Sequence, residues 1–227
     1  MDIFFLKLSI MLVPGLMAIT CHEVSHGYVA DRLGDGTARS LGRLTLNPLR
    51  HLDIIGTLMV FLVGIGWAKP VPVNFHHLRN PKKDMVWVAA AGPVTNFILA
   101  FLSAMVLRAG VAVTERLSSP LSEQVLYPLL LMLAFSVYIN LLLAVFNLIP
   151  VPPLDGGRVA VGLLPPRPAL ALARLEPYGM IMIVLLVFFT NIFSLVLQPA
   201  LAAGIHFLAG PETEWVFQML ISRVIGR

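Results

Sequence analysis

Long apolar stretches are the feature that most constrains how this chain can fold. Each has at least the roughly 20 residues that a helix needs to cross the hydrocarbon core of a bilayer, and they cover residues 3–33, 85–111, 126–149 and 178–197. The sequence is 58% hydrophobic and only 12% charged, whereas soluble domains carry about 25% charged residues. A soluble core of this length could not bury so much apolar surface. The sequence therefore predicts an α-helical polytopic membrane protein, and no basic cluster favours a nucleic-acid partner.

Two parts of the chain depart from this simple pattern. Residues 53–67 are apolar but short for a span, and they contain three glycines. Their flanks alternate in polarity or carry prolines, which is typical of extended backbone, so we predict a membrane re-entrant β-hairpin element over about residues 37–75. Near the C-terminus, residues 200–208 form either a fifth, short span or a re-entrant piece, and an amphipathic surface helix is expected from residue 211.

Ionisable residues occur together within the first apolar stretch, at His22, Glu23 and His26. The two histidines are four residues apart and therefore lie on one face of a helix, where they can share a tetrahedral Zn²⁺. Glu23 is displaced from His22 by about 100° around the helix. It can act as a base beside the metal, which lowers the pKa of bound water to about 7. HExxH also occurs by chance, and the alternative is a polar helix end that faces solvent.

A catalytic zinc needs a third protein ligand, and Asp155 differs from the other acidic residues in its surroundings. It follows the third long apolar stretch, in the sequence NLIPVPPLDGGRV. The prolines restrict the backbone before Asp155, and two glycines permit close approach after it. The alternative is a turn residue that caps the next helix. We predict one Zn²⁺ per chain, bound by His22, His26 and Asp155.

The membrane topology decides whether these ligands can meet. At 1.5 Å per residue, His22 lies roughly 28 Å along the first helix, near its far end. If residues 53–67 are re-entrant, Asp155 emerges on the same side of the membrane as the histidines. The loops on that side, 31–83 and 150–176, then carry eleven Lys and Arg residues, and the opposite side has only three, namely Lys7, Arg108 and Arg116. This positive-inside bias predicts that the metal site lies near the cytoplasmic face.

Taken together, these motifs make the chain resemble the site-2 proteases, a family of intramembrane zinc metalloproteases. The resemblance rests on HEVSH at 22–26, AGPVTNF at 91–97 and NLIPVPPLDGG at 147–157. It implies a three-helix metalloprotease core within residues 1–160. The apolar pattern predicts that a C-terminal membrane helix or helices and the amphipathic tail follow over residues 161–227. The chain looks like a minimal member that lacks the PDZ or CBS domain of many relatives. Carried over by motif, the zinc ligands are His22, His26 and Asp155, and the catalytic base is Glu23. The resemblance also implies that Asn96 and Asn147 contact the substrate, and the alternative for these two is interhelical hydrogen bonding.

A substrate helix must unwind before water can attack its peptide bonds, and its freed backbone groups then need new partners. We predict that the segment WAKPVPVN, residues 67–74, supplies them by β-augmentation. Pro70 and Pro72 remove donors along one edge only. The other edge keeps the backbone groups of Val71 and Val73 for substrate binding. The alternative is a rigid loop that anchors the hairpin at the membrane surface.

These features favour an intramembrane endopeptidase that hydrolyses membrane-spanning protein substrates in a bacterial or archaeal cell membrane. A membrane zinc transporter would also explain intramembrane His, Glu and Asp residues. Transport needs ligands along a path, however, and here they gather at one depth. A third possibility is a non-proteolytic binding protein with the same fold, although the intact HExxH motif argues against it.

Overall fold

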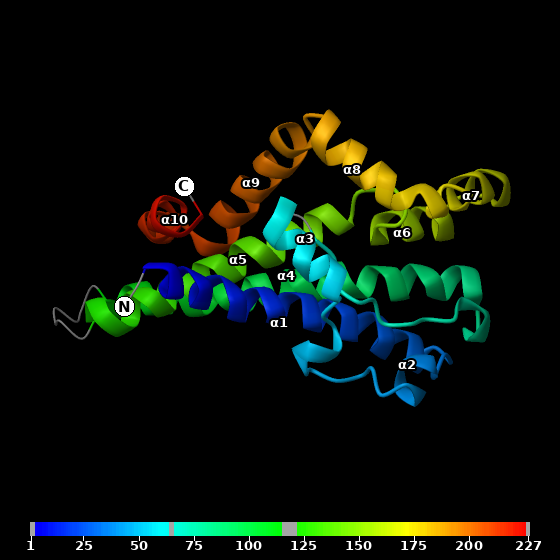
Figure 1. Cartoon of the computed structure of the whole chain (residues 1–227), viewed down its shortest axis with the longest axis horizontal. Coiled ribbons are helices and arrows are strands. Elements are labelled where there is room, and N and C mark those ends of the chain that lie inside the picture. Colours follow the sequence, from blue (N-terminus) through cyan, green and yellow to red (C-terminus); the bar gives the residue numbers. More distant parts are fainter. Residues whose placement is uncertain (1–2, 64–65, 115–121, 226–227) are drawn as a thin grey trace. The chain divides into compact units, whose positions relative to one another are not determined.

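The computed structural model describes residues 3–63, 66–114 and 122–225, and most of these residues are helical (Figure 1). The α-helices in this part of the chain are α1 (Ile3–Arg32), α2 (Thr37–Ser40), α3 (Ile54–Val63), α4 (Pro81–Thr114), α5 (Tyr127–Asn147), α6 (Asp155–Leu163), α7 (Pro166–Ala173), α8 (Gly179–Phe189), α9 (Gln198–Ala209) and α10 (Glu214–Leu220). Shorter 3-10 or π-helical turns are η1 (Pro48–Arg50), η2 (Phe75–His77), η3 (Ser122–Leu126), η4 (Glu176–Tyr178), η5 (Phe193–Leu197), η6 (Pro211–Thr213) and η7 (Ile221–Ile225).

Four helical stretches in the described ranges are long and apolar enough to cross a membrane, namely Phe5–Arg32, Pro81–Thr114, Gln124–Asn147 and Pro166–Phe189. The first three agree with the predicted spans. The fourth includes α7 and α8 and lies earlier in the chain than the predicted range 178–197. It ends at Phe189, and the hydroxyl of the next residue, Thr190, donates a hydrogen bond to the carbonyl of Leu186. A fifth candidate combines two helical pieces, Phe193–Ala209 and Pro211–Ile225, that are bent by 103°.

The predicted β-hairpin element over residues 37–75 is not formed as a sheet. The described residues of this segment contain no strand, and a single antiparallel bridge joins Leu52 to Ala68. Between these two residues, α3 is 10 residues long, which corresponds to about 15 Å and is half of what a span requires. An apolar segment without a strand partner can satisfy its backbone groups internally only as a helix. The prediction of β-hairpins is therefore wrong for the described residues of this segment, and its re-entrant path stays a prediction.

The chain divides into two compact units, and the first comprises Met1–Ala18, Asn96–Val145 and Phe193–Arg227. Its core contains small residues of α4, Ala100 and Ala104, both fully buried. Small side chains allow neighbouring helices to approach closely. Polar contacts join α4 to α5 in the same unit, because the side chain of Asn96 donates a hydrogen bond to Asn140 at 2.8 Å and the hydroxyls of Ser103 and Ser136 are 2.8 Å apart.

The second unit comprises Ile19–Thr95 and Phe146–Ile192. It contains the later part of α1, the earlier part of α4, and α6, which carry the residues of the HExxH motif, the AGP sequence and Asp155. Ala30, Leu78 and Val88 form a small buried cluster within it. The predicted boundary near residue 160 between a catalytic core and a C-terminal part stays a prediction.

Candidate metal centre

Helix α1 presents His22 and His26 on one face, one turn apart. Their Nε2 atoms are 3.1 Å from each other, and His22 is only 7% exposed. The Nδ1–H of His26 donates a hydrogen bond to the carbonyl of Val88 on α4, at 2.7 Å. A donor at Nδ1 leaves the Nε2 lone pair of the neutral ring available to a metal. The sequence spacing of four residues thus produces a pair of imidazoles, one of which has a defined tautomer.

Asp155 is the first residue of α6 and is 7% exposed. Its Oδ2 lies 3.1 Å from Nε2 of His22 and 3.4 Å from Nε2 of His26. Burial by itself raises the pKa of this carboxyl, but two adjacent imidazoles that carry a proton on Nε2 lower it more. In the metal-binding state, in which the Nε2 atoms carry no proton, a bound metal ion would balance the charge of the carboxylate instead.

Glycines allow the turn that carries Asp155 to pack closely. A Cβ atom at Gly156 would lie 2.2 Å from the carbonyl oxygen of Leu148, and one at Gly157 would lie 2.4 Å from the backbone nitrogen of Pro152. Both distances are far below van der Waals contact with backbone that cannot simply rotate away. The two glycines after Asp155 are thus required by the close packing of this turn, as the sequence predicted.

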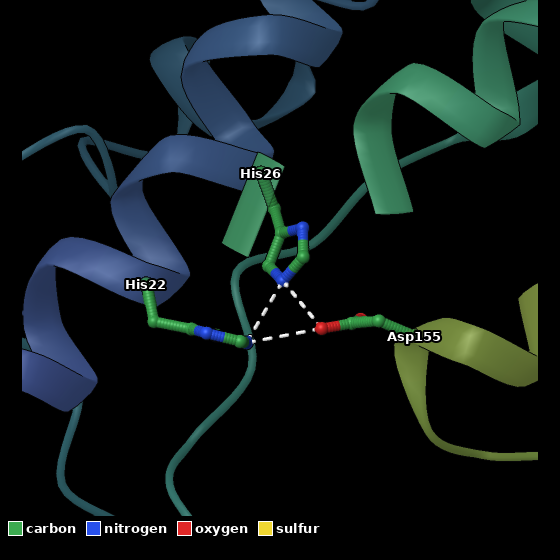
Figure 2. A group of neighbouring side chains, drawn as sticks. All are labelled: His22, His26 and Asp155. Carbon is green, nitrogen blue, oxygen red and sulfur yellow. Dashed lines mark hydrogen bonds and ion pairs between the residues drawn. The ribbon is translucent and has the colours of Figure 1, made fainter. Parts of the chain in front are cut away.

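The three side chains point toward one another from two helices, α1 and α6 (Figure 2). A tetrahedral Zn²⁺ with ligands at about 2.0–2.2 Å separates those ligands by about 3.3 Å, close to the observed distances of 3.1, 3.1 and 3.4 Å. Oδ2 of Asp155 is buried and receives no well-directed hydrogen bond from the described residues. Within the described residues, this is the only group of three or more His, Cys, Asp or Glu side chains whose ligand atoms converge. The donor set fits a zinc ion.

Gly92 of α4 completes the surroundings of the two imidazoles. A Cβ atom at this position would lie 2.5 Å from Cε1 of His22 and 2.5 Å from Nε2 of His26. The absence of a side chain at Gly92 therefore allows the two imidazoles to pack directly against the backbone of α4. The sequence does not predict this role, although Gly92 belongs to the AGPVTNF motif, because spacing alone does not indicate which residues of α4 face α1.

Glu23 lies on α1 beside the metal-binding group but is not one of its converging members. Its Oε2 accepts a hydrogen bond from the backbone N–H of Val71 at 2.8 Å. Val71 is 7% exposed and lies in the extended segment that precedes η2. A half-buried carboxylate with a single backbone donor can still accept a proton, which is what a general base requires.

The other candidate substrate residues have different surroundings. The amide of Asn96 donates hydrogen bonds to the carbonyl of Ala18 at 3.2 Å and to Asn140, all within the first unit. Asn147 ends α5 and belongs to the second unit. Val73 packs against the small cluster that contains Leu78. The structure thus brings Val71 to Glu23 through its backbone, whereas the roles of the other three residues toward a substrate stay predictions.

Comparison with known proteins gives matches along most of the chain. The family model described as "Peptidase family M50" matches residues 10–190. YwhC of Bacillus subtilis (strain 168), whose name provisionally describes a zinc metalloprotease, is 40% identical over 211 residues, which cover 88% of this chain and 91% of YwhC. Rip2 of Mycolicibacterium smegmatis, named in the same way, is 30% identical over 189 residues, or 80% of this chain and 68% of Rip2. No solved structure matches the chain significantly.

Proposed function

Because this chain belongs to peptidase family M50, the site-2 proteases, we propose that it is a zinc metalloendopeptidase that cleaves membrane-spanning protein substrates within the bilayer. The observation that carries the proposal is the convergence of His22, His26 and Asp155, with Glu23 beside them on the same helix. The long apolar helices of an integral membrane protein support a substrate in the same membrane. The bacterial relatives make a bacterial cell membrane the expected location.

The residues of the site have complementary tasks in peptide hydrolysis. His22, His26 and Asp155 would hold one Zn²⁺, which when bound supplies a Lewis acid that polarises the scissile carbonyl and acidifies water. The carboxylate of Glu23 takes a proton from the attacking water and later gives it to the nitrogen of the departing amine. The carbonyl of Val88 keeps His26 in the tautomer with a free Nε2.

The extended segment that includes Val71 and Val73 remains the candidate for binding an unwound substrate. The N–H of Val71 is engaged by Glu23, whereas the backbone groups of Val73 make no hydrogen bond with the described residues. Such free groups are what β-augmentation requires. Roles for Asn96 and Asn147 in substrate contact rest on the family motifs.

We also propose a re-entrant path for residues 53–67 with the metal site near the cytoplasmic face. Support comes from the bridge between Leu52 and Ala68 and from the hydrogen bond that Lys69 N–H donates to His51 at 2.8 Å. These contacts join the two ends of the segment, so the segment enters and leaves at neighbouring positions, which supports a re-entrant path. The eleven basic residues in the loops 31–83 and 150–176 support a cytoplasmic location for this end of the protein.

Cysteine labelling tests this topology. In a Cys21→Ser background, cysteines at the exposed positions Leu49 and Leu163 should react with a membrane-impermeant maleimide only from the cytoplasmic side. A cysteine at Val113, near the end of α4, should react only from the outside and serves as the control. Labelling of positions 49 and 163 from opposite sides would contradict the re-entrant path and, with it, the three-ligand site.

Metal-dependent cleavage tests the proposed activity. Purified protein in lipid vesicles should shorten a fluorescent single-span reporter peptide whose helix is weakened by glycine and proline. A zinc chelator should stop the reaction and added Zn²⁺ should restore it, and elemental analysis should give about one zinc per chain. A folded double variant, His22→Ala with His26→Ala, should contain no zinc. Undiminished zinc in that variant would contradict the ligand assignment, and zinc flux into vesicles without cleavage would favour a transporter.

A further inference from the structure

The residues 69–74, here called the strap, lie along α1 in an extended conformation without belonging to a sheet. Apart from backbone hydrogen bonds at its ends, such as the one from Lys69 to His51, charged side chains hold the backbone of the strap. The guanidinium of Arg43 donates hydrogen bonds to the carbonyls of Lys69 at 3.0 Å and Pro70 at 3.2 Å. Further along, Asp35 accepts the N–H of Asn74 at 2.7 Å. The contact of Val71 with Glu23 lies between these two attachments.

Asp35 is a fully buried carboxylate in the link between α1 and α2. Besides Asn74, it accepts hydrogen bonds from the backbone N–H of Thr37 at 3.1 Å, from the hydroxyl of Thr37, and from Nδ1 of His77 at 3.2 Å. Burial raises the pKa of Asp35, but these donors outweigh it and lower the pKa, so the group is ionised. A buried charge is expensive unless it is fully hydrogen-bonded. The connections of Asp35 therefore fix the end of the strap firmly.

The side chain of Val71 fixes the position of the strap along α1. A Cβ atom at Gly27, the residue after His26, would lie only 2.7 Å from Cγ1 of Val71. The strap therefore packs directly against the α1 backbone at a position where no side chain intervenes. This close contact sets the Val71 N–H opposite Glu23, one turn earlier on the helix.

We propose that Arg43 and Asp35 are positioning residues that hold the Val71 N–H against Glu23, so that this amide orients the catalytic carboxylate. The inference rests on the proposed function, in which Glu23 is the base. Among the described residues, Val71 provides the only hydrogen bond to the side-chain carboxylate of Glu23. A glutamate side chain otherwise samples many rotamers, and a misplacement of about 1 Å can cost about 10²-fold in rate.

Replacing the Val71 amide by an ester tests the inference, because α-hydroxyisovaleric acid at this position removes the N–H and retains the side chain. We expect kcat for the reporter peptide to fall by about 10- to 100-fold, with KM within about twofold of wild type and zinc content unchanged. The matched control is an ester at Leu46, which is 59% exposed and whose N–H makes no hydrogen bond with the described residues. A Val71 ester with wild-type kcat but raised KM would show that the strap only binds substrate, and it would overturn the inference.

Hydrogen exchange gives a readout that does not depend on activity. Because Pro70 and Pro72 have no N–H, the peptide 70–74 reports on only three amides, those of Val71, Val73 and Asn74. In the wild-type protein, the amides of Val71 and Asn74 should exchange at least about tenfold more slowly than that of Val73.

Variants at the two attachments extend this measurement. Asp35→Ala and Arg43→Ala should each raise Val71 exchange and lower kcat while zinc content stays normal, and Arg43→Lys should restore part of both. Unchanged Val71 exchange in both alanine variants would overturn the positioning role. A different result would separate the two proposals. If the wild-type protein showed the slow exchange of Val71 but cleaved no reporter at full zinc content, the proposed endopeptidase activity would be wrong. The strap would then still hold Glu23, but the catalytic part of this inference would fail with the proposed activity.

Discussion

Replacement of Glu23 by Gln should lower turnover by about 10²- to 10⁴-fold, which is the usual contribution of general-base catalysis. Gln retains the shape of the side chain, and its Oε1 can still accept the N–H of Val71, but it cannot take a proton from water. We therefore expect a folded protein with about one zinc per chain that hardly cleaves. The measurement combines reporter cleavage in vesicles, elemental analysis, and a comparison of membrane fragments from cells with the wild-type and variant proteins.

The matched control for this variant is the same chemical change at Glu176. This residue forms an exposed ion pair with Arg158 at 3.0 Å, and pairs of this kind contribute little to stability. Glu176→Gln should cleave at close to the wild-type rate. Near wild-type cleavage by Glu23→Gln would remove Glu23 from the mechanism, and it would favour a function that needs metal ligands but no base.

Substitution of Gly92 by Ala should abolish zinc binding. The added methyl group would lie within 2.6 Å of three ring atoms of His22 and His26, and Gly92 sits inside the long helix α4, whose backbone cannot shift locally without breaking hydrogen bonds. The imidazoles must turn away from Asp155, and the ligand set is lost. Elemental analysis should show zinc falling from about one per chain to nearly none, with zinc affinity reduced by at least about 10²-fold, as expected when ligand orientation is lost.

A second glycine provides the control for this experiment. A Cβ atom at Gly15 of α1 would meet nothing within 4 Å, and alanine is favoured over glycine in a helix by about 1 kcal/mol. Gly15→Ala should therefore retain full zinc content and activity. If folded Gly92→Ala also retained its zinc, metal binding would not require the close packing of the two imidazoles against Gly92, and the prediction would be wrong.

The metal-binding group could be predicted from sequence because its geometry is mostly local. The spacing of His22 and His26 specifies one helix face, and the prolines and glycines around Asp155 specify a tight turn. The meeting of these two elements is not local, and it required an argument from span number and charge. That argument needs only residues 53–67 to be non-spanning, with which the ten-residue helix α3 is compatible.

The strap and the side chains that hold it could not be predicted from sequence, because their contacts are not local. Alternating polarity and prolines indicate extended backbone, but they do not distinguish a sheet from a segment held by side chains. Arg43, Glu23 and Asp35 replace neighbouring strands as hydrogen-bond partners here, and they are far apart in sequence from the residues that they bind. Gly92 is a similar case, because its importance depends on a contact between two helices.

The backbone of the strap also has a consequence for self-association of the folded protein. Exposed strand edges are templates on which a second copy of the same chain can pair, which leads to aggregation. Along one edge of the strap, Pro70 and Pro72 offer no N–H, and along the other the donor of Val71 is occupied by Glu23. In a folded copy, the N–H of Val73 is therefore the only donor along this edge without a hydrogen bond to the described residues, and one donor is too few for a stable intermolecular sheet, even though this apolar chain contains an extended segment.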